Sequence, residues 1–191
     1  MPVEITRDGS VCVLLSGGLD SAACVAFYLA RGFQVRTLHL DYGQPAALQE
    51  EAASAAIAKY FNVARIGLRL RGAAPKSAGL VYGRNGLLLL IALMELHQEI
   101  SLFASGIHAG TRYADCSQSF VRTMQEIFDL YTDGVCRVAA PFAEWSKRDI
   151  WEFSLKHQVP IDLTYSCESG GQKPCGKCLS CQDMEALRVP A

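Results

Sequence analysis

The residues from Ser16 to Ser21 read Ser-Gly-Gly-Leu-Asp-Ser and stand between an apolar run and a predicted helix. A turn of this composition places backbone N–H groups beside a helix N-terminus, where unpaired donors and the helix dipole favour a phosphate. The glycines let the backbone approach the anion, and the two serine hydroxyls can add donors. The alternative is an ordinary strand-to-helix turn capped by Asp20 or Ser21. Adjacent glycines between serines favour phosphate binding over that alternative.

Four cysteines have the spacing of a metal site: Cys167, Cys175, Cys178 and Cys181. Two intervals of two residues let thiolates converge on one ion, and four soft ligands suit tetrahedral Zn²⁺ with no open position. We therefore predict a structural zinc. An iron–sulfur cluster is the sharper alternative because Cys-x2-Cys-x2-Cys also begins the ferredoxin pattern, but the following Cys-Pro is missing. A redox disulfide would leave two of the four cysteines unexplained.

Neither the Gly-x4-Gly-Lys-Ser/Thr phosphate loop nor a Gly-x-Gly-x-x-Gly dinucleotide fingerprint occurs in the chain. The loop resembles instead the Ser-Gly-Gly-x-Asp-Ser pyrophosphate loop (PP-loop) of the ATP pyrophosphatase superfamily, whose members adenylate a substrate oxygen and release pyrophosphate. Together with the four cysteines it resembles the QueC family of 7-cyano-7-deazaguanine synthases. Further motifs stand where that family has them: Asp41-Tyr42-Gly43-Gln44, Gly83-Arg84-Asn85, Tyr113-x-Asp115-Cys116 and Trp145-Ser146-Lys147.

The resemblance implies an ATP-dependent carbon–nitrogen ligase of queuosine biosynthesis. Such an enzyme adenylates 7-carboxy-7-deazaguanine, releases pyrophosphate and then AMP, and uses ammonia to form 7-cyano-7-deazaguanine (preQ0). It also implies ATP as co-substrate, Mg²⁺, a structural Zn²⁺ and a homodimer. A second hypothesis is a divergent enzyme that stops at the amide or conjugates the activated deazaguanine to another amine, such as one on a partner protein. A tRNA-directed enzyme and a non-catalytic zinc protein are weaker alternatives.

By the same resemblance, one segment would hold ATP. Its members are Leu15, Ser16, Gly17, Gly18, Leu19, Asp20, Ser21, Ala22, Ala23, Cys24 and Val25. The catalytic candidates are Ser16, Asp20, Ser21, Arg84 and Lys147. Charge builds on the departing pyrophosphate, so the two cations in this set are the candidates to stabilise it. Asp20 either orients Mg²⁺ or caps the helix.

The resemblance further implies a pocket for a purine-like base that bears a carboxylate. Its candidate residues are Tyr42, Gln44, Arg84, Asn85 and Asp115. The tyrosine ring can stack on the base, the amides can hydrogen-bond it, and the aspartate can pair with its guanine-like amidine edge. His39 and His108 lie near carboxyl ends of predicted strands, but the family motif singles out neither, and they are not counted as catalytic candidates.

The chain departs from the family pattern at several places. Gln44-Pro45-Ala46 stands where Gln-Arg-His is usual, and Ser117 replaces the Arg of Pro-Asp-Cys-Arg. Asp183 and Met184 stand where an Arg is expected after the last cysteine, and Glu168 replaces a common Tyr. The loop after the third predicted strand is also short. Fewer cations would impair the second activation most, so we expect adenylation to survive and nitrile formation to be slow or absent.

The elements that must position these residues follow from short apolar runs that alternate with amphipathic stretches, the pattern of a mostly parallel sheet covered by helices on both faces. Strands are predicted at 11–15, 35–40, 63–70, 101–105 and 135–140, and helices at 21–30, 46–61, 87–98, 118–130 and from Ser146. The helix at 87–98 is apolar almost all round, so we expect it to be buried. The Gly- and Pro-containing stretch at 71–84 is a candidate lid.

The resemblance implies the adenine nucleotide α-hydrolase-like, Rossmann-like form of this α/β fold. We expect an ATP pyrophosphatase domain at 1–160, with a zinc-binding segment at 161–191 packed on it as one structural domain. The 191 residues carry a net charge of −1, which lacks the basic excess of a general nucleic-acid binder. Without a run of about 20 apolar residues or a signal peptide, we expect a cytoplasmic protein that does not span a membrane.

Overall fold

The structure is a computed structural model of the chain and describes residues 9–72, 76–110 and 113–188. Its centre is a five-stranded, wholly parallel sheet in the order β3-β2-β1-β4-β5. The strands are β1 (Ser10–Leu14), β2 (Gln34–Asp41), β3 (Ala64–Arg69), β4 (Leu102–Ala104) and β5 (Arg137–Ala139). Strand order reverses between β1 and β4, and ligands of open parallel sheets bind at such a reversal, outside the carboxyl ends of the strands.

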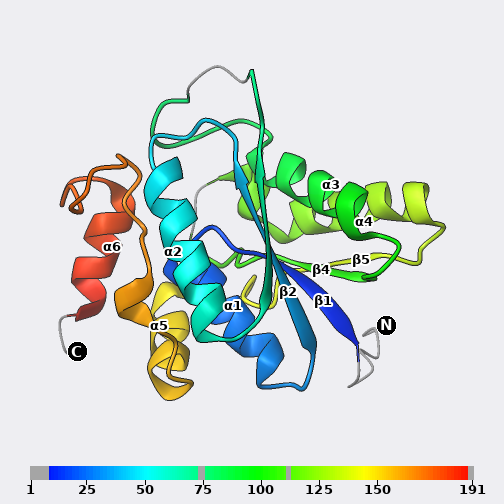
Figure 1. Cartoon of the computed structure of the whole chain (residues 1–191), viewed down its shortest axis with the longest axis horizontal. Helices are drawn as coiled ribbons and strands as arrows, with labels where there is room; N and C mark the ends of the chain where they lie inside the picture. The colour runs from blue at the N-terminus through cyan, green and yellow to red at the C-terminus, as the bar shows by residue number, and fades with distance from the viewer. Residues whose placement is uncertain (1–8, 73–75, 111–112, 189–191) are drawn as a thin grey trace.

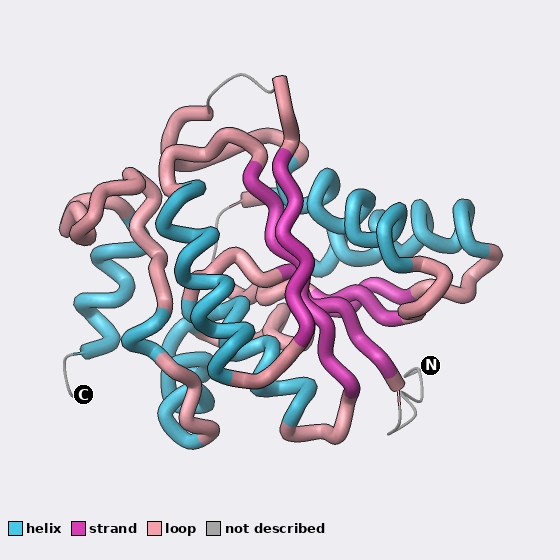
Figure 2. The backbone as a smooth tube through the Cα atoms, in the orientation of Figure 1, coloured by secondary structure: helices cyan, strands magenta, loops and turns pink. Residues whose placement is uncertain are grey.

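Helices cover both faces of the sheet (Figures 1 and 2). On one face, α1 (Leu19–Leu29), α2 (Ala47–Tyr60) and α5 (Lys147–Lys156) share a hydrophobic cluster with β1. On the other, α3 (Arg84–Leu96) and α4 (Gln118–Thr132) form the second cluster. The remaining elements are the short helices η1 (Ala114–Cys116) and η2 (Ile161–Leu163) and the last helix, α6 (Leu179–Arg188). The predicted layered α/β fold is thus confirmed.

Strand β1 shows why the first apolar run is a central strand. Val11 and Val13 point into the cluster of α1, whereas Cys12 and Leu14 point into the cluster of α3, and all four are buried. A strand covered on both faces has no polar side, so its sequence is continuously apolar. This strand ends directly before the predicted phosphate loop.

Helix α3 differs from its prediction in start and burial. It begins at Arg84, three residues earlier than expected, and it is not buried all round. Leu89, Ala92, Leu93 and Leu96 pack into the core. Leu87 and Leu90 are each 37% exposed and Met94 is 66% exposed. The expected full burial is therefore wrong, because only one face of the helix meets the sheet and α4.

The segment after η2 packs onto the α/β layers. Helix α6, which was not predicted, contacts α5, and its Leu187 joins the cluster of α1. The amide of Tyr165 donates to the carbonyl of Gly17 across 2.9 Å. A Cβ at Gly170 would lie 2.0 Å from the carbonyl oxygen of Pro45, so this glycine permits a close approach of the two loops. Within the described residues, no helix has the length and apolar character needed to cross a membrane.

Candidate active site

The predicted phosphate loop lies at the reversal of strand order. The backbone of Leu15 donates to Leu38 of β2, and the chain then turns at Gly17 and Gly18 into α1. From β4, Gly106 approaches so closely that a Cβ there would lie 2.8 Å from the carbonyl group of Asp20. The loops that follow β1 and β4 therefore meet where a parallel sheet binds ligands.

Inside this loop the two serine hydroxyls converge. Ser16 Oγ lies 3.1 Å from Ser21 Oγ and accepts a 3.3 Å hydrogen bond from the amide of Gly18, while Ser21 Oγ donates to the carbonyl of Gly18. Helix α1 starts after Gly18 without a side-chain cap, so neither Asp20 nor Ser21 caps it. Its first N–H groups are left for an anion.

The rest of the predicted ATP segment lies in the core. Leu19, Ala22, Ala23, Cys24 and Val25 are all 0% exposed, and Leu15 is 1% exposed. Burial also raises the pKa of the Cys24 thiol far above its usual range, with the nearby Asp20 charge acting in the same direction. These buried side chains can position the loop, whereas Ser16, Gly18 and Asp20 are exposed or partly exposed.

Asp20 and Lys147 form an ion pair across the loop mouth. Lys147 Nζ donates to both carboxylate oxygens of Asp20 at 2.6 Å, and His108 Nε2 lies 3.7 Å from Oδ2. Lys147 is the first residue of α5, which Ser146 and Asp149 start with a capping box. The cap therefore fixes the helix end that presents the lysine to the loop.

A second polar group follows β2. Tyr42 lies within hydrogen-bonding reach of the Arg84 guanidinium, and its amide donates to Gln44 Oε1 at 2.8 Å. Gln44 Nε2 in turn donates to Glu50 Oε2 at 2.7 Å. Burial raises the pKa of both Tyr42 and Glu50 above their ordinary values. Sequence reasoning did not single out Glu50, which is placed here by the turn into α2.

Asn85 and Asp115 come together at the start of α3. The Asn85 side-chain Nδ2 donates to the Asp115 carbonyl at 2.8 Å, and the Asn85 backbone N–H donates to Asp115 Oδ2 at 3.3 Å. Gly83 precedes the helix in the left-handed conformation, with φ of 75°, and cannot cap it. The carboxylate of Asp115 therefore satisfies a helix N-terminus, besides lying near Arg84.

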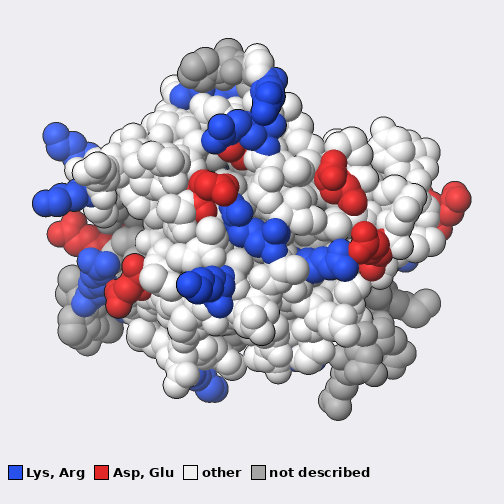
Figure 3. Space-filling view, viewed as in Figure 1, with Lys and Arg blue, Asp and Glu red and all other residues white. Residues whose placement is uncertain are grey.

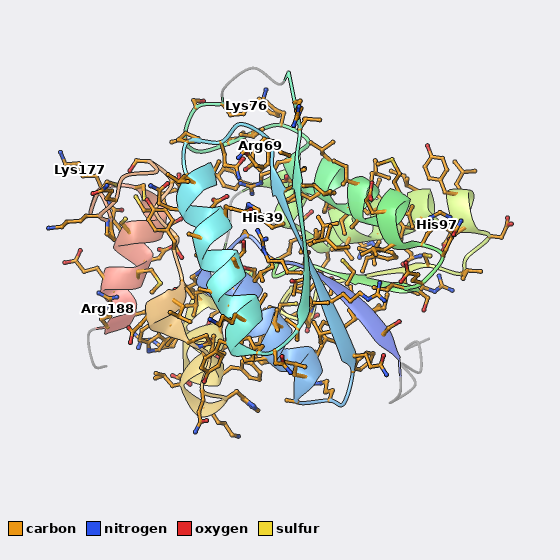
Figure 4. All side chains as sticks on the ribbon, in the orientation of Figure 1. His39, Arg69, Lys76, His97, Lys177 and Arg188 are labelled. Atoms are coloured by element: carbon orange, nitrogen blue, oxygen red, sulfur yellow. The ribbon has the colours of Figure 1, made fainter. Side chains whose placement is uncertain are left out.

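Below the phosphate loop lies a polar network around the buried His39 that sequence reasoning missed. His39 is 2% exposed, and its Nδ1 lies 3.2 Å from the carbonyl oxygen of Leu15. Its Nε2 lies 3.5 Å from Glu51, which also pairs with Arg65 at 2.5 Å. Burial lowers the pKa of His39, although the Leu15 carbonyl and the Glu51 charge act the other way. Figure 4 shows His39 between α2 and the sheet.

The four predicted metal ligands converge. The Sγ atoms of Cys167, Cys175, Cys178 and Cys181 all lie within 4.8 Å of one another. The Cys175 and Cys181 sulfurs are 3.9 Å apart. Four thiolates at about 2.3 Å from a tetrahedral zinc would be about 3.8 Å apart, so the cluster fits such an ion.

The thiols of this cluster differ in acidity. Burial alone would raise the pKa of the Cys167 thiol, but hydrogen bonds from the Ser169 hydroxyl and the Cys175 amide lower it to about 6. Burial raises the pKa of Cys181 to about 12. A metal ion would bind all four as thiolates. Four thiolates are soft ligands and fill every position of a tetrahedral ion, so no position remains open for a substrate.

Basic side chains gather above the site. Figure 3 shows a group of them just below the grey residues at the top of the molecule, in the region where Figure 4 places Arg69 and Lys76. Arg69 Nε bonds Asp41 Oδ2 at 2.7 Å, and the amide of Lys76 donates to the carbonyl of Gly43. The loop after β3 thus reaches the turn that carries Tyr42 and Gln44.

We expect the two glycines of the phosphate loop to fail in different ways when each becomes alanine. Gly17 has φ of 95°, and a Cβ there would lie 2.9 Å from the Glu50 carbonyl oxygen, so Gly17→Ala should lose about 1–3 kcal/mol of stability. Gly18 has φ of −81° and room for a Cβ, so Gly18→Ala should stay folded. It should lose ATP turnover, because the added methyl group blocks the close approach of the phosphates to the loop backbone. Thermal unfolding measures the stability of each variant, and AMP release measures its turnover. Equal unfolding temperatures for the two variants would contradict the structural role given to Gly17.

The sequence matches one family model and its curated relatives over most of the chain. The family model described as "Queuosine biosynthesis protein QueC" matches residues 10–78 and 71–187. A 7-cyano-7-deazaguanine synthase of Synechococcus sp. (strain CC9311) is 32% identical over 92% of this chain and 90% of its own length. That of Thermoplasma volcanium is 32% identical over 89% and 82%.

Solved structures share the fold at low identity. NMN synthetase from Francisella tularensis matches 96% of this chain and 79% of its own, with a TM-score of 0.54 and 14% identity. A 4-thiouridine synthetase in an RNA complex with bound ATP matches 94% of this chain and 49% of its own, with a TM-score of 0.50 and 16% identity. These two neighbours support the fold class.

Proposed function

The chain belongs to the family of the queuosine biosynthesis protein QueC, and from this premise we propose that it adenylates 7-carboxy-7-deazaguanine with ATP and converts it to 7-cyano-7-deazaguanine. One observation carries the proposal. The uncapped start of α1, the Asp20–Lys147 pair and the polar group around Tyr42 and Arg84 all lie at the carboxyl ends of β1, β2 and β4. A triphosphate and a purine-like base can therefore meet there.

The proposed chemistry begins with a carboxylate that has no leaving group. Its oxygen attacks the α-phosphorus of ATP, and the bond to the departing pyrophosphate breaks. Ammonia then adds to the acyl carbon and its nitrogen loses one proton, and AMP leaves with the former carboxylate oxygen to give the amide. A second adenylation, now on the amide oxygen, lets AMP depart again as the nitrogen loses its two protons and the nitrile forms.

The residues act by holding and neutralising these groups. We propose that Ser16, Ser21 and the Gly18 amide bind the phosphates, and that Lys147 moves from Asp20 to the departing pyrophosphate. Arg84 would assist from the base side. Asp20 then has a free carboxylate, which fits Mg²⁺ bound with ATP, and that ion would supply further positive charge. We assign the cysteine cluster to a structural Zn²⁺.

A second candidate is an enzyme that stops at the amide or passes the activated deazaguanine to another amine. The residues that replace family cations here have structural contacts. Ser117 caps α4, Met184 packs on the core cluster of α1, and the Pro45 carbonyl lies against Gly170. Arg69 and Lys76 lie beside the Asp41–Gln44 turn, however, and can return some of the missing positive charge.

The deciding experiment incubates the protein with 7-carboxy-7-deazaguanine, ATP and ammonia and follows products by mass spectrometry. We expect AMP and pyrophosphate, with the amide accumulating first because family cations are replaced, and with the nitrile forming slowly from it. Efficient nitrile formation would remove the second candidate. The matched reaction without ammonia, with a candidate protein partner, tests conjugation; ADP as the nucleotide product would contradict the proposal as a whole.

The assembly is also a proposal. We infer a homodimer, and the exposed apolar stripe of Leu87, Leu90 and Met94 on α3 supplies a surface for a second copy. Light scattering behind size-exclusion chromatography measures this directly. A monomer at micromolar concentration would contradict the inference.

A further inference from the structure

Glu50 is a carboxylate inside the group of residues expected to hold the base. It follows the Asp41–Gln44 turn, and its Oε2 accepts a 2.7 Å hydrogen bond from Gln44 Nε2. Arg84 and Asp41 are close enough for their charges to act on it, and its own charge acts on Tyr42. Its backbone carbonyl packs against Gly17 of the phosphate loop. Glu50 thus lies between the predicted nucleotide site and the predicted base site.

Gln44 fixes the orientation of this carboxylate from one side. Gln44 is 8% exposed, and its Oε1 accepts from the Tyr42 amide, so its NH₂ group has to face Glu50. The same NH₂ also reaches the carbonyl of Leu40 at 3.4 Å. Hydrogen bonding therefore orients one oxygen of Glu50. Among the described residues, no hydrogen bond is formed by the other oxygen, Oε1.

Asp115, the other candidate carboxylate, is engaged differently. Its Oδ2 accepts from the Asn85 amide at the start of α3, and its Oδ1 lies 3.9 Å from the Cys116 thiol. Removing it would leave a helix N-terminus without its acceptor. These contacts favour a role in holding α3, and through it Asn85 and Arg84, over a role in reading the base.

The two edges that could face a carboxylate have different chemistry. A guanine-type base presents an N1–H and a 2-amino group side by side, which are donors only and match the two oxygens of a carboxylate. The adenine of ATP presents an amino donor beside the N1 acceptor, and the acceptor would face a carboxylate oxygen unfavourably. Burial raises the pKa of Glu50. A desolvated carboxylate gains more from two such donors than an exposed one.

We propose that Glu50 is the specificity-determining residue that reads the N1–H and 2-amino edge of the deazapurine, while Asp115 positions α3. The inference rests on the proposed function, because it assumes that a guanine-type base enters this site. It assigns Tyr42 to the face of the base, and Gln44 to the orientation of Glu50.

The test compares two substrates across three proteins. The substrates are 7-carboxy-7-deazaguanine and its analogue that lacks the 2-amino group, 7-carboxy-7-deazahypoxanthine. The proteins are the unmodified enzyme, Glu50→Gln and Asp115→Asn, and the readout is kcat/KM for AMP release. The unmodified enzyme should prefer the 2-amino substrate by about 100-fold, because the analogue leaves the Glu50 oxygen that the bound base covers without a hydrogen-bond donor.

We expect the preference to fall below about 10-fold in Glu50→Gln, because an amide in place of the carboxylate offers one acceptor and sets a donor against the base. Asp115→Asn should lose rate on both substrates equally and keep the 100-fold preference. The KM for ATP should stay within about twofold in Glu50→Gln. An unchanged preference in Glu50→Gln, its collapse in Asp115→Asn, or a large rise in the ATP KM would each overturn the inference.

Two further measurements keep the result decisive. Glu50→Asp retains a carboxylate, so it should keep a preference above that of Glu50→Gln; if Glu50→Gln does not fold, Glu50→Ala replaces it as the variant without a carboxylate. If the unmodified enzyme releases no AMP, the proposed reaction fails. Calorimetric binding of 7-deazaguanine then decides separately: binding that is lost in Glu50→Gln supports the inference, and absence of binding to the unmodified protein overturns it.

Discussion

Cys178→Ala should abolish metal binding, lower the unfolding temperature by about 10 °C or more and stop ATP turnover. Structural zinc sites bind with apparent free energies of about 10–16 kcal/mol, which equals or exceeds the stability of a typical domain. Loss of one thiolate of four should therefore cost about 4 kcal/mol or more of folding free energy. In a chain of this size, each kcal/mol shifts the unfolding temperature by about 2–4 °C.

The loss of activity follows from the contacts of the cysteine segment. Tyr165 bonds the Gly17 carbonyl, and the Tyr165 hydroxyl bonds Gly171 within the loop between the first two cysteines. Gly170 lies against Pro45, next to Gln44. A metal that holds this loop therefore also holds one side of the phosphate loop and of the predicted base site. Without it, both should loosen together.

Ser180→Ala is the matched control for the cysteine variant. Ser180 lies beside Cys181 on α6 and donates a 2.9 Å hydrogen bond to Glu168, so its loss should cost only about 0.5–1.5 kcal/mol and leave the metal bound. Elemental analysis and thermal unfolding measure both variants. Iron and acid-labile sulfide, or a metal-free protein with an unchanged unfolding temperature, would refute the structural zinc.

The fold was predictable because its signals are local. Strands β1 and β4 are apolar runs beside turn residues, and β1 reads as continuously apolar because α1 and α3 bury it from both faces. The start of α5 was predictable from Ser146 and Asp149, since a capping box is a pattern only four residues long. The phosphate loop and the cysteine cluster have similarly short spacings.

What could not be predicted depends on three-dimensional neighbours. The apolar residues of α3 indicated burial on every side. The sequence of the helix does not show whether another element packs over Leu90 and Met94, and both are exposed. Helix α6 has only two buried residues, Cys181 and Leu187. Two buried positions are too few to form a helical pattern that can be recognised in the sequence. Glu50 reads in sequence as one of two adjacent acids on a helix, which are usually solvated. Only the fold shows that Gln44 faces one of them and His39 the other.

The pairing of Asp20 with Lys147 joins residues 127 positions apart and depends on the order of the strands. Because β4 lies beside β1, the chain returns from β5 to the same end of the sheet, and α5 begins over the phosphate loop. Sequence reasoning placed the lysine near the phosphates through the family resemblance. The residues alone gave no distance.

Lys147→Ala should lower kcat by about 100- to 1,000-fold and change the KM for ATP by no more than a few-fold. Negative charge grows on the pyrophosphate as its bond to the α-phosphorus breaks, so a cation aimed there stabilises the transition state more than bound ATP. Before ATP binds, Asp20 holds Lys147 Nζ through both carboxylate oxygens. This ion pair positions the Lys147 ammonium beside the phosphate loop. Exchanging the Asp20 oxygens for phosphate oxygens should cost little free energy, because the ammonium keeps an anionic partner.

The fold should survive this change, which lets the rate loss be read as chemistry. Both members of the pair are partly exposed, with side-chain exposures of 23% and 26%, so the ion pair contributes at most about 1 kcal/mol to stability. Lys156→Ala removes an exposed lysine from the other end of the same helix and should leave kcat unchanged. Steady-state AMP release and pre-steady-state bursts measure the two variants. A rise in the ATP KM with unchanged kcat would mean that Lys147 binds ATP and its transition state equally, and would remove it from the catalytic set.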